Sequence, residues 1–304
     1  MENKTFVFGH KNPDTDSIMS SMVMANLENQ LGNNAKAVRL GNINKETEFV
    51  FKYLGIEAPE LISDVENGQN VILVDHNEST QSVNNLQNAN IQKVVDHHTM
   101  NFVAPYQLYY RAEPVGCTAT VLYKMYKEYD IAITKNIATM MLSAIISDTL
   151  LFKSPTCTDE DIKVAKELAK IAQIDIESYG MDMLKAGTDL NDFSAEELIN
   201  IDAKEFNSNG IKYAIAQVNT VSIPDVLKRK EEIEEAINNA IKEKGLKLFL
   251  FAITDIVNSN STGIVLGERT DIVEKTYKVE NNCIDMPGVV SRKKQIIPVI
   301  EANI

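Results

Sequence analysis

The sequence predicts an α/β protein with two domains: an N-terminal domain built on a doubly wound, mainly parallel sheet, and a smaller C-terminal α/β domain. Strand-like and helix-like segments alternate through the first half of the 304-residue chain, which is typical of a sheet covered by helices. The length suits two domains, and a hydrophobic fraction of 44% allows each a core. The turn-rich stretch GTDLNDF predicts a linker at residues 188–193, between domains at 1–187 and 194–304.

In the first domain the strand pattern is clearest at Asn70–Asp75 (NVILVD), a near-continuous apolar run of the kind found in parallel strands buried on both faces. The other predicted strands are Thr5–Gly9, Ala35–Leu40 and Ile91–Asp96. Helical spacing predicts helices at Ser17–Leu31 and Lys45–Leu54. Helical patterns then dominate from Cys117 to about Ala186.

In the second domain, helical spacing predicts helices at Ser194–Phe206, at Pro224–Lys244 and near Asp271–Tyr277. The second of these begins with proline, which is favoured at the first helical position. Predicted strands cover Lys212–Val221, Lys247–Asp255 and Gly263–Gly267. The alternation again indicates an α/β domain.

The composition narrows the class of function. The chain has 43 Asp+Glu and 30 Lys+Arg, a net charge of −13, and a nucleic-acid binder needs a basic face. A small anionic substrate remains compatible, because metal ions or a local basic cluster can reverse the field in one site. The longest stretch without charged residues, His97–Tyr110, is too short to span a membrane. No signal-peptide core is expected, and three widely spaced cysteines predict a cytoplasmic location.

The four histidines, His10, His76, His97 and His98, are the most informative feature of the sequence. Each lies within four residues of an aspartate at the end of a predicted strand. Ligands of open α/β sheets bind at the carboxyl ends of the strands. A single histidine is more often structural, but all four in this position predict a functional site.

The stretch GHKNPDTDS can direct His10, Asp14 and Asp16 at one point, because it leaves a strand and opens a helix. A helix cap would explain Asp16 or Ser17 alone. It would not explain His10 and Asp14 as well, so the pattern favours metal ligation.

Two further aspartates and a histidine pair extend this set. Asp75 ends a buried strand, and Asp148 lies in the most apolar helical stretch, where a carboxylate needs a cation or a donor. We expect the adjacent rings of His97 and His98 to point different ways, so that one binds metal and the other contacts substrate. Two imidazoles and four carboxylates suit Mn²⁺, Co²⁺ or Mg²⁺, and suffice for two metals that share a carboxylate.

The densest basic cluster of the acidic chain lies near its end, in the stretch GVVSRKKQ with Arg292, Lys293 and Lys294. A solvated basic tail is the simplest interpretation. The cluster, however, follows Pro287-Gly288 and precedes an apolar run, which predicts a loop between ordered segments that can bind phosphate oxygens. Lys204 alone is weaker evidence for the same role.

Several motifs resemble known families. GHKNPDTDS, VDHNE, VVDHH and SAIISDTLLFKSPTCT resemble the four signature regions of the DHH phosphoesterase superfamily. EPVGCTATVL, LLFKSPTCTDED and PGVVSRKKQIIP more narrowly resemble family II, the manganese-dependent soluble inorganic pyrophosphatases, over essentially the whole chain.

The resemblance implies a role for each motif position. One metal would be held by His10, Asp14 and Asp75, and a second by Asp16, Asp75, His97 and Asp148. His98 would face the substrate phosphate, and Lys204, Arg292 and Lys293 would bind phosphate from the second domain. Asp96 is expected to orient a neighbouring ligand. His76 and Lys294 receive no role.

The implied activity is hydrolysis of pyrophosphate to two orthophosphates in the cleft between the domains, by a hydroxide that bridges two Mn²⁺ ions and attacks phosphorus in line. Co²⁺ is a possible substitute for Mn²⁺, and Mg²⁺ would arrive with the substrate. The family also suggests a cytoplasmic homodimer with no nucleic-acid or membrane partner. The alternatives are a DHH phosphodiesterase on short oligonucleotides, an exopolyphosphatase, and a non-catalytic metal- or anion-binding protein.

Overall fold

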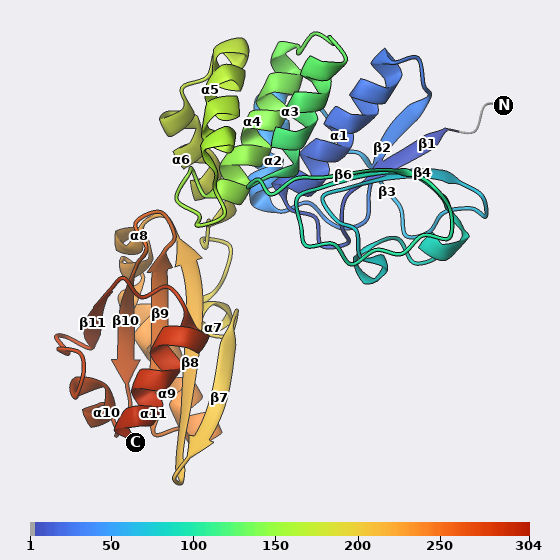
Figure 1. Ribbon diagram of the computed structural model, residues 1–304. Coiled ribbons are helices and arrows are strands. Elements are labelled where there is room, and N and C mark those ends of the chain that lie inside the picture. The colour runs from blue at the N-terminus through green and yellow to red at the C-terminus, as the bar shows by residue number, and fades with distance from the viewer. Residues whose placement is uncertain (1–3) are drawn as a thin grey trace. The chain divides into compact units, whose positions relative to one another are not determined.

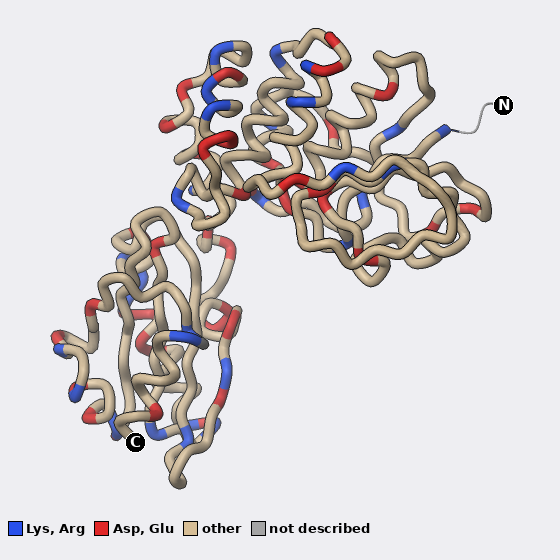
Figure 2. Tube along the Cα trace, viewed as in Figure 1, with Lys and Arg blue, Asp and Glu red and all other residues tan. Residues whose placement is uncertain are grey.

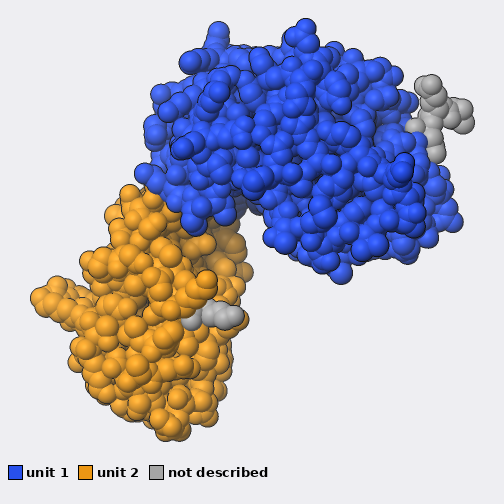
Figure 3. All heavy atoms as spheres, in the orientation of Figure 1, with its two compact units in different colours: residues 1–187 blue, residues 188–304 orange. Residues whose placement is uncertain are grey.

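The computed structural model describes residues 4–304, except for the side chain of Lys293. The chain divides into two compact units, residues 1–187 and 188–304 (Figure 3). Charges of both signs are spread over the helices and loops of both units (Figure 2). Within the described residues, no helix is long and apolar enough to cross a membrane.

Unit 1 is built on a six-stranded, wholly parallel sheet in the order β3-β2-β1-β4-β5-β6. Its strands are β1 Thr5–Phe8, β2 Ala35–Arg39, β3 Glu60–Leu61, β4 Asn70–Val74, β5 Asn90–Asp96 and β6 Tyr109–Ala112. From β1 the chain builds outward to β3, and then returns to add β4 on the other side of β1. This reversal is a topological switch point, the place where such sheets bind ligands.

The helices of unit 1 are α1 Thr15–Gln30, α2 Lys45–Leu54, α3 Thr118–Glu128, α4 Lys135–Thr149, α5 Asp159–Ala172 and α6 Ile176–Gly187. Helices α1, α3 and α4 pack side by side over the sheet (Figure 1). A second apolar core, which includes Phe8, Leu73 and Val94 of the sheet, is closed by Val83 and Leu86 from the β4–β5 connection. Single-turn helices at Ser79–Gln81 and Leu86–Asn88 thus stand where a doubly wound fold often has longer helices.

Unit 2 has a five-stranded mixed sheet in the order β11-β10-β9-β8-β7, in which only the β8–β9 pair is parallel. The strands are β7 Ala203–Ser208, β8 Ile211–Thr220, β9 Leu248–Asp255, β10 Asn260–Leu266 and β11 Cys283–Pro287. The helices are α7 Ala195–Leu198, α8 Ile223–Leu227, α9 Lys230–Lys244, α10 Asp271–Glu274 and α11 Ile297–Asn303. A π-helical turn at Arg292–Ile296 leads directly into α11.

Alternate side chains of β9 point to opposite faces and feed two cores. Phe249 and Phe251 pack with the face that α7 and α9 cover, and Leu248 and Leu250 pack with the face of α10 and α11. The strand is buried along its whole length, as a central strand covered on both sides must be. The predicted fold class, an α/β protein with a parallel sheet and a smaller second sheet, is confirmed.

Two helix predictions are wrong in detail. The segment predicted as a helix at Ser194–Phe206 forms only the short α7, and β7 then pairs antiparallel with β8. Asn209 and Gly210, both with positive φ, form the two-residue hairpin turn that fixes this pairing. The helix predicted at Pro224–Lys244 is broken between α8 and α9.

Candidate metal centre

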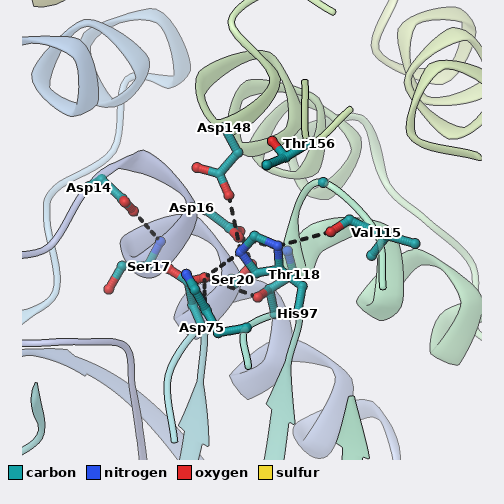
Figure 4. Close-up of polar contacts among 12 residues, drawn as sticks. Asp14, Asp16, Ser17, Ser20, Asp75, His97, Val115, Thr118, Asp148 and Thr156 are labelled. Atoms are coloured by element: carbon teal, nitrogen blue, oxygen red, sulfur yellow. Dashed lines mark hydrogen bonds and ion pairs between the residues drawn. The ribbon is translucent and has the colours of Figure 1, made fainter. Parts of the chain in front are cut away.

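The carboxyl ends of β1, β4 and β5 lie side by side around the switch point, and each leads into one of the histidine–aspartate motifs. The last turn of α4 brings Asp148 to the same place (Figure 4). The six metal-ligand candidates predicted from the sequence are His10, Asp14, Asp16, Asp75, His97 and Asp148. The structure brings all six together.

The turn after β1 places Asp14 and Asp16 differently. Helix α1 begins at Thr15, two residues earlier than predicted, and Asp14 is its cap: Oδ1 accepts a hydrogen bond of 2.9 Å from the Ser17 backbone N–H. The other carboxylate oxygen of Asp14 lies 3.4 Å from His10 Nε2, so one side chain both caps the helix and faces the cluster. Asp16 is fully buried, and its two oxygens accept bonds from the Ser20 hydroxyl and the Thr118 backbone N–H.

Asp75 is the centre of the arrangement. Its Oδ2 lies 3.4 Å from His10 Nε2 and its Oδ1 lies 3.3 Å from His97 Nε2, while the Thr118 hydroxyl donates to Oδ1. The backbone of Asp75 is left-handed, with φ of 58°, a conformation that aspartate tolerates better than most residues. This turn is what aims the carboxylate back between β1 and β5.

Asp96 fixes the pair His97–His98. Its Oδ1 accepts hydrogen bonds from the backbone N–H groups of both histidines and contacts His98 Nδ1 at 2.9 Å. Asn77 donates to the other oxygen. This tight turn holds the two rings 4.2 Å apart between centroids, so the expectation that they point different ways is wrong. His97 Nδ1 contacts the Val115 carbonyl, which leaves Nε2 to face Asp75 and Asp148.

Asp148 closes the cluster from α4, with an oxygen 3.5 Å from His97 Nε2. The chain then makes an unusual turn, because Leu150, Leu151 and Phe152 all adopt positive φ values of 46°, 52° and 68°. Three consecutive left-handed residues other than glycine are unfavourable for L-amino acids. The turn ends α4 at Thr149, one residue after Asp148.

Mutual proximity shifts the pKa values of these groups strongly. Burial alone would lower the pKa of His10, but the carboxylates of Asp14 and Asp75 outweigh it and raise the pKa to about 10. Burial also favours the neutral form of His97, but the carboxylates of Asp75 and Asp16 outweigh this effect and raise its pKa to about 9. Burial together with the charge of Asp75 raises the pKa of Asp16 to about 7. Burial and the nearby carboxylates raise the pKa of Asp148 well above its usual range.

The donor atoms form two principal sets that share Asp75. His10, Asp14 and Asp75 form one, and Asp16, Asp75, His97 and Asp148 form the other; in each, one ligand atom per residue lies within 4.8 Å of the rest. Asp75, His97 and His98 meet the same criterion. Carboxylate oxygens and imidazole nitrogens fit Mn²⁺, Mg²⁺ or Co²⁺. Mutual repulsion raises the pKa of buried carboxylates that lie close together, and a bound divalent cation relieves that repulsion.

A cavity of about 250 Å³ opens beside this cluster. Its lining residues are His10, Asp75, His76, Asn77, Glu78, Gln81, His98 and Thr99. His76, which received no role from the sequence, is buried with Nδ1 at 2.9 Å from the Val74 carbonyl, and burial lowers its pKa. The cavity is large enough for a small anion.

The basic residues predicted to bind phosphate lie in unit 2. Arg292 is nearly buried, and its guanidinium donates to the backbone carbonyl and, at 2.9 Å, to the carboxylate of Asp202. Both residues line a pocket of about 510 Å³ together with Gln217. Lys204 is exposed on β7. The side chain of Lys293 lies outside what the structure describes.

Sequence reasoning missed the residues that orient these groups. Asp202, Val115 and Thr118 have ordinary polar or apolar surroundings in the sequence, and only folding brings them to Arg292, His97 and Asp16. The EPVGCTATVL motif contains Val115 and Thr118, but it was informative only as a family resemblance. No spacing rule links it to the histidines.

Comparison with protein families defines the class first. Residues 4–145 match the DHH family, N-terminal domain, and residues 181–303 match the DHHA2 domain. The parallel sheet, the switch-point cluster and the second sheet therefore belong to a two-domain protein of the DHH superfamily.

Individual relatives narrow this class. Proteins named probable manganese-dependent inorganic pyrophosphatase are 54% identical in Bacillus cytotoxicus and 52% identical in Bacillus cereus, each over 98% of this chain and 97% of the relative. A solved Methanococcus jannaschii structure, assigned to family II inorganic pyrophosphatases, is 41% identical over 99% of both chains, with a TM-score of 0.65. The chain belongs to the family II, manganese-dependent inorganic pyrophosphatases, as its motifs suggested.

A more distant structure shares the fold alone. An exopolyphosphatase-related protein from Bacteroides fragilis is 14% identical over 99% of this chain and 91% of its own, with a TM-score of 0.51.

Because His10 is paired with Asp14 and Asp75, we expect the stability of the metal-free protein to depend on pH. His10 has a pKa near 6.5 when unfolded and about 10 when folded, so its contribution is complete below pH 6.5. The contribution is lost as the pH rises from 6.5 towards 10. We expect urea unfolding of metal-free protein to show falling stability over this range, with a smaller fall in His10→Gln. An equal fall in both proteins would contradict this assignment.

Proposed function

We propose that this protein hydrolyses inorganic pyrophosphate to two orthophosphates, with two divalent cations held at the switch point of unit 1. The observation that carries the proposal is the pair of donor sets sharing Asp75. The pyrophosphatase names of relatives 52–54% identical over almost the whole chain support the substrate. Their names also support Mn²⁺ as the resident metal.

In this proposal His10, Asp14 and Asp75 hold one cation, and Asp16, Asp75, His97 and Asp148 hold the other. When bound, such cations would lower the pKa of a coordinated water, so that hydroxide would be available to attack phosphorus in line. Asp75 links the two proposed sites, because one of its oxygens faces His10 and the other faces His97. Co²⁺ is a proposed substitute, and Mg²⁺ a proposed companion of the substrate.

His98 is proposed to contact the substrate phosphate. Its Nδ1 is engaged by Asp96, which leaves Nε2 as the free ring nitrogen, and about half of the side chain is exposed. His98 also lines the cavity beside the donor sets. A ring fixed through one nitrogen can present the other to a phosphate oxygen without losing further rotational freedom.

Unit 2 is proposed to supply the phosphate-binding cations Arg292, Lys293 and Lys204. The contact with Asp202 holds the Arg292 guanidinium in one orientation, and a planar, ordered guanidinium matches phosphate oxygens well. These cations would neutralise the charge that develops on both phosphates during hydrolysis.

The activity is tested by giving metal-stripped protein Mn²⁺, Co²⁺, Mg²⁺ or Zn²⁺ and measuring phosphate release. Pyrophosphate, tripolyphosphate and a dinucleotide are the substrates. We expect rapid turnover of pyrophosphate with Mn²⁺ or Co²⁺, because the site offers hard and borderline ligands. We expect little turnover of the other two substrates, because the relatives are named for pyrophosphate. Preferential cleavage of tripolyphosphate or of the dinucleotide would favour the exopolyphosphatase or phosphodiesterase alternative.

Asp75→Asn tests the shared ligand. The amide keeps the size of the side chain and its tolerance of the left-handed backbone but removes the charge that both sites use. We expect calorimetry to show that at least one of two Mn²⁺ equivalents is lost, with activity reduced at least about 100-fold. Arg292→Ala is the matched control, which should raise KM for pyrophosphate and leave Mn²⁺ binding intact. Two equivalents bound by Asp75→Asn at unchanged affinity would exclude the shared role.

A homodimer is proposed through the edge of the unit 1 sheet. Among the described residues β6 forms one edge of the sheet, and exposed apolar side chains lie on it at Tyr109 and in the connection before it at Met100, Val103 and Tyr106. Edge strands with apolar surroundings favour pairing with another chain. Sedimentation should give twice the chain mass of 33.9 kDa, and a persistent monomer would refute the proposal.

A cytoplasmic location stays a prediction, which the three free cysteines support.

A further inference from the structure

One loop orients three of the candidate metal ligands. In the segment 115–118, which follows β6 and ends at the first residue of α3, the Val115 carbonyl lies 3.0 Å from His97 Nδ1. The Thr118 backbone N–H donates to Asp16 at 2.7 Å, and the Thr118 hydroxyl donates to Asp75 at 3.1 Å. Figure 4 shows Val115 and Thr118 on the same side of the cluster as His97. The position of this loop therefore sets the orientation of ligands that belong to the four-residue donor set.

The loop is itself held by a fully buried carboxylate from α5, that of Asp161. Asp161 Oδ2 accepts a hydrogen bond of 2.8 Å from the Gly116 backbone N–H. Asp161 Oδ1 accepts one of 2.6 Å from the Thr120 hydroxyl, in the first turn of α3. Gly116 within the ligand-orienting segment and Thr120 just after it are thus both tied to one side chain more than forty residues away in the sequence.

A helix cap does not account for these contacts. Asp161 forms a capping box with Thr158, whose backbone N–H and hydroxyl both donate to Oδ2. A capping box needs only the local bonds, and it functions at an exposed helix end. In addition Asp161 accepts the two long-range bonds, and burying a carboxylate is unfavourable unless such bonds satisfy it.

Gly116 allows the close approach that this requires. A Cβ atom at this position would lie 2.8 Å from Asp161 Oδ2 and 3.1 Å from both Thr149 Cγ2 and the Thr156 carbonyl oxygen. The loop therefore packs closely against the end of α4, the turn before α5 and α5 itself. A larger residue would have to move the loop away from these neighbours.

We propose that Asp161 is a positioning residue that sets metal affinity at the donor set of Asp16, Asp75, His97 and Asp148. This inference rests on the proposed metal sites. Displacement of the loop would remove the acceptor that orients the His97 ring and the two Thr118 donors that fix Asp16 and Asp75. The set of His10, Asp14 and Asp75 shares only Asp75 with the loop, so the two metal sites should respond unequally.

The first test is Asp161→Asn, measured by calorimetric titration of metal-free protein with Mn²⁺. The amide nitrogen cannot accept, so at least one of the N–H or hydroxyl donors around Asp161 loses its partner. We expect affinity at one site to fall about 10-fold or more, while the other changes by less than about 3-fold, because loss of an outer-shell partner typically weakens metal binding 10–100-fold. The variant should lose activity at low Mn²⁺ concentration, and saturating Mn²⁺ should restore part of that activity.

Gly116→Ala displaces the same loop without changing the carboxylate, and it decides the question if Asp161→Asn does not fold. Leu168→Ala is the matched control: this fully buried leucine lies on the same helix, and its truncation destabilises the fold without removing a hydrogen bond, because the side chain is apolar. Thermal unfolding of each metal-free variant gives the loss of stability for comparison.

The outcomes separate this inference from the proposed function. If the unmodified protein binds no Mn²⁺, the proposed function fails. If it binds two equivalents and both Asp161→Asn and Gly116→Ala bind them with unchanged affinity, the positioning role is overturned. It is also overturned if Leu168→Ala weakens Mn²⁺ binding as much as the loop variants do, since the effect would then follow stability alone.

Discussion

The carboxylate of Asp75 contacts two imidazoles, those of His10 and His97, and the order of the strands in the sheet makes this possible. One oxygen faces His10 from the end of β1 and the other faces His97 from the end of β5, so β4 must lie between these two strands. The left-handed backbone of Asp75 turns the side chain back over the sheet edge. A buried carboxylate is tolerated because both oxygens have partners.

The two units handle charge in opposite ways. Unit 1 concentrates carboxylates until their pKa values rise, which prepares a place for cations. Unit 2 holds the guanidinium of Arg292 against Asp202, which keeps a cation ordered in an acidic chain. An acidic protein can therefore bind an anionic ligand, because its net charge does not determine the electrostatic potential at one site.

Sequence patterns predicted which candidate ligands cluster better than they predicted the residues that orient them. His10, Asp75 and His97 follow strands whose apolar runs are unmistakable, and parallel strands must end at one edge. The helical pattern of residues 194–206 conceals strand β7, which the hairpin turn at Asn209-Gly210 pairs with β8. The contacts of Asp202 depend on tertiary geometry, which no local periodicity encodes. Asp96, predicted to orient a neighbouring ligand, bonds to His97 and His98, the two residues directly after it.

The left-handed turn at Leu150–Phe152 has a consequence for how this protein tolerates heat. Each of its residues is held in a conformation that costs about 1 kcal/mol or more relative to a relaxed one. Glycine would remove that cost at the partly buried Leu150 and Phe152, whereas at the buried Leu151 it would also remove a core side chain, which costs more than the strain it relieves. The same torsions end α4 at Thr149, one residue after Asp148, and relaxing them would let the helix end fray beside that carboxylate. Thermal stability and the placement of Asp148 therefore depend on the same turn.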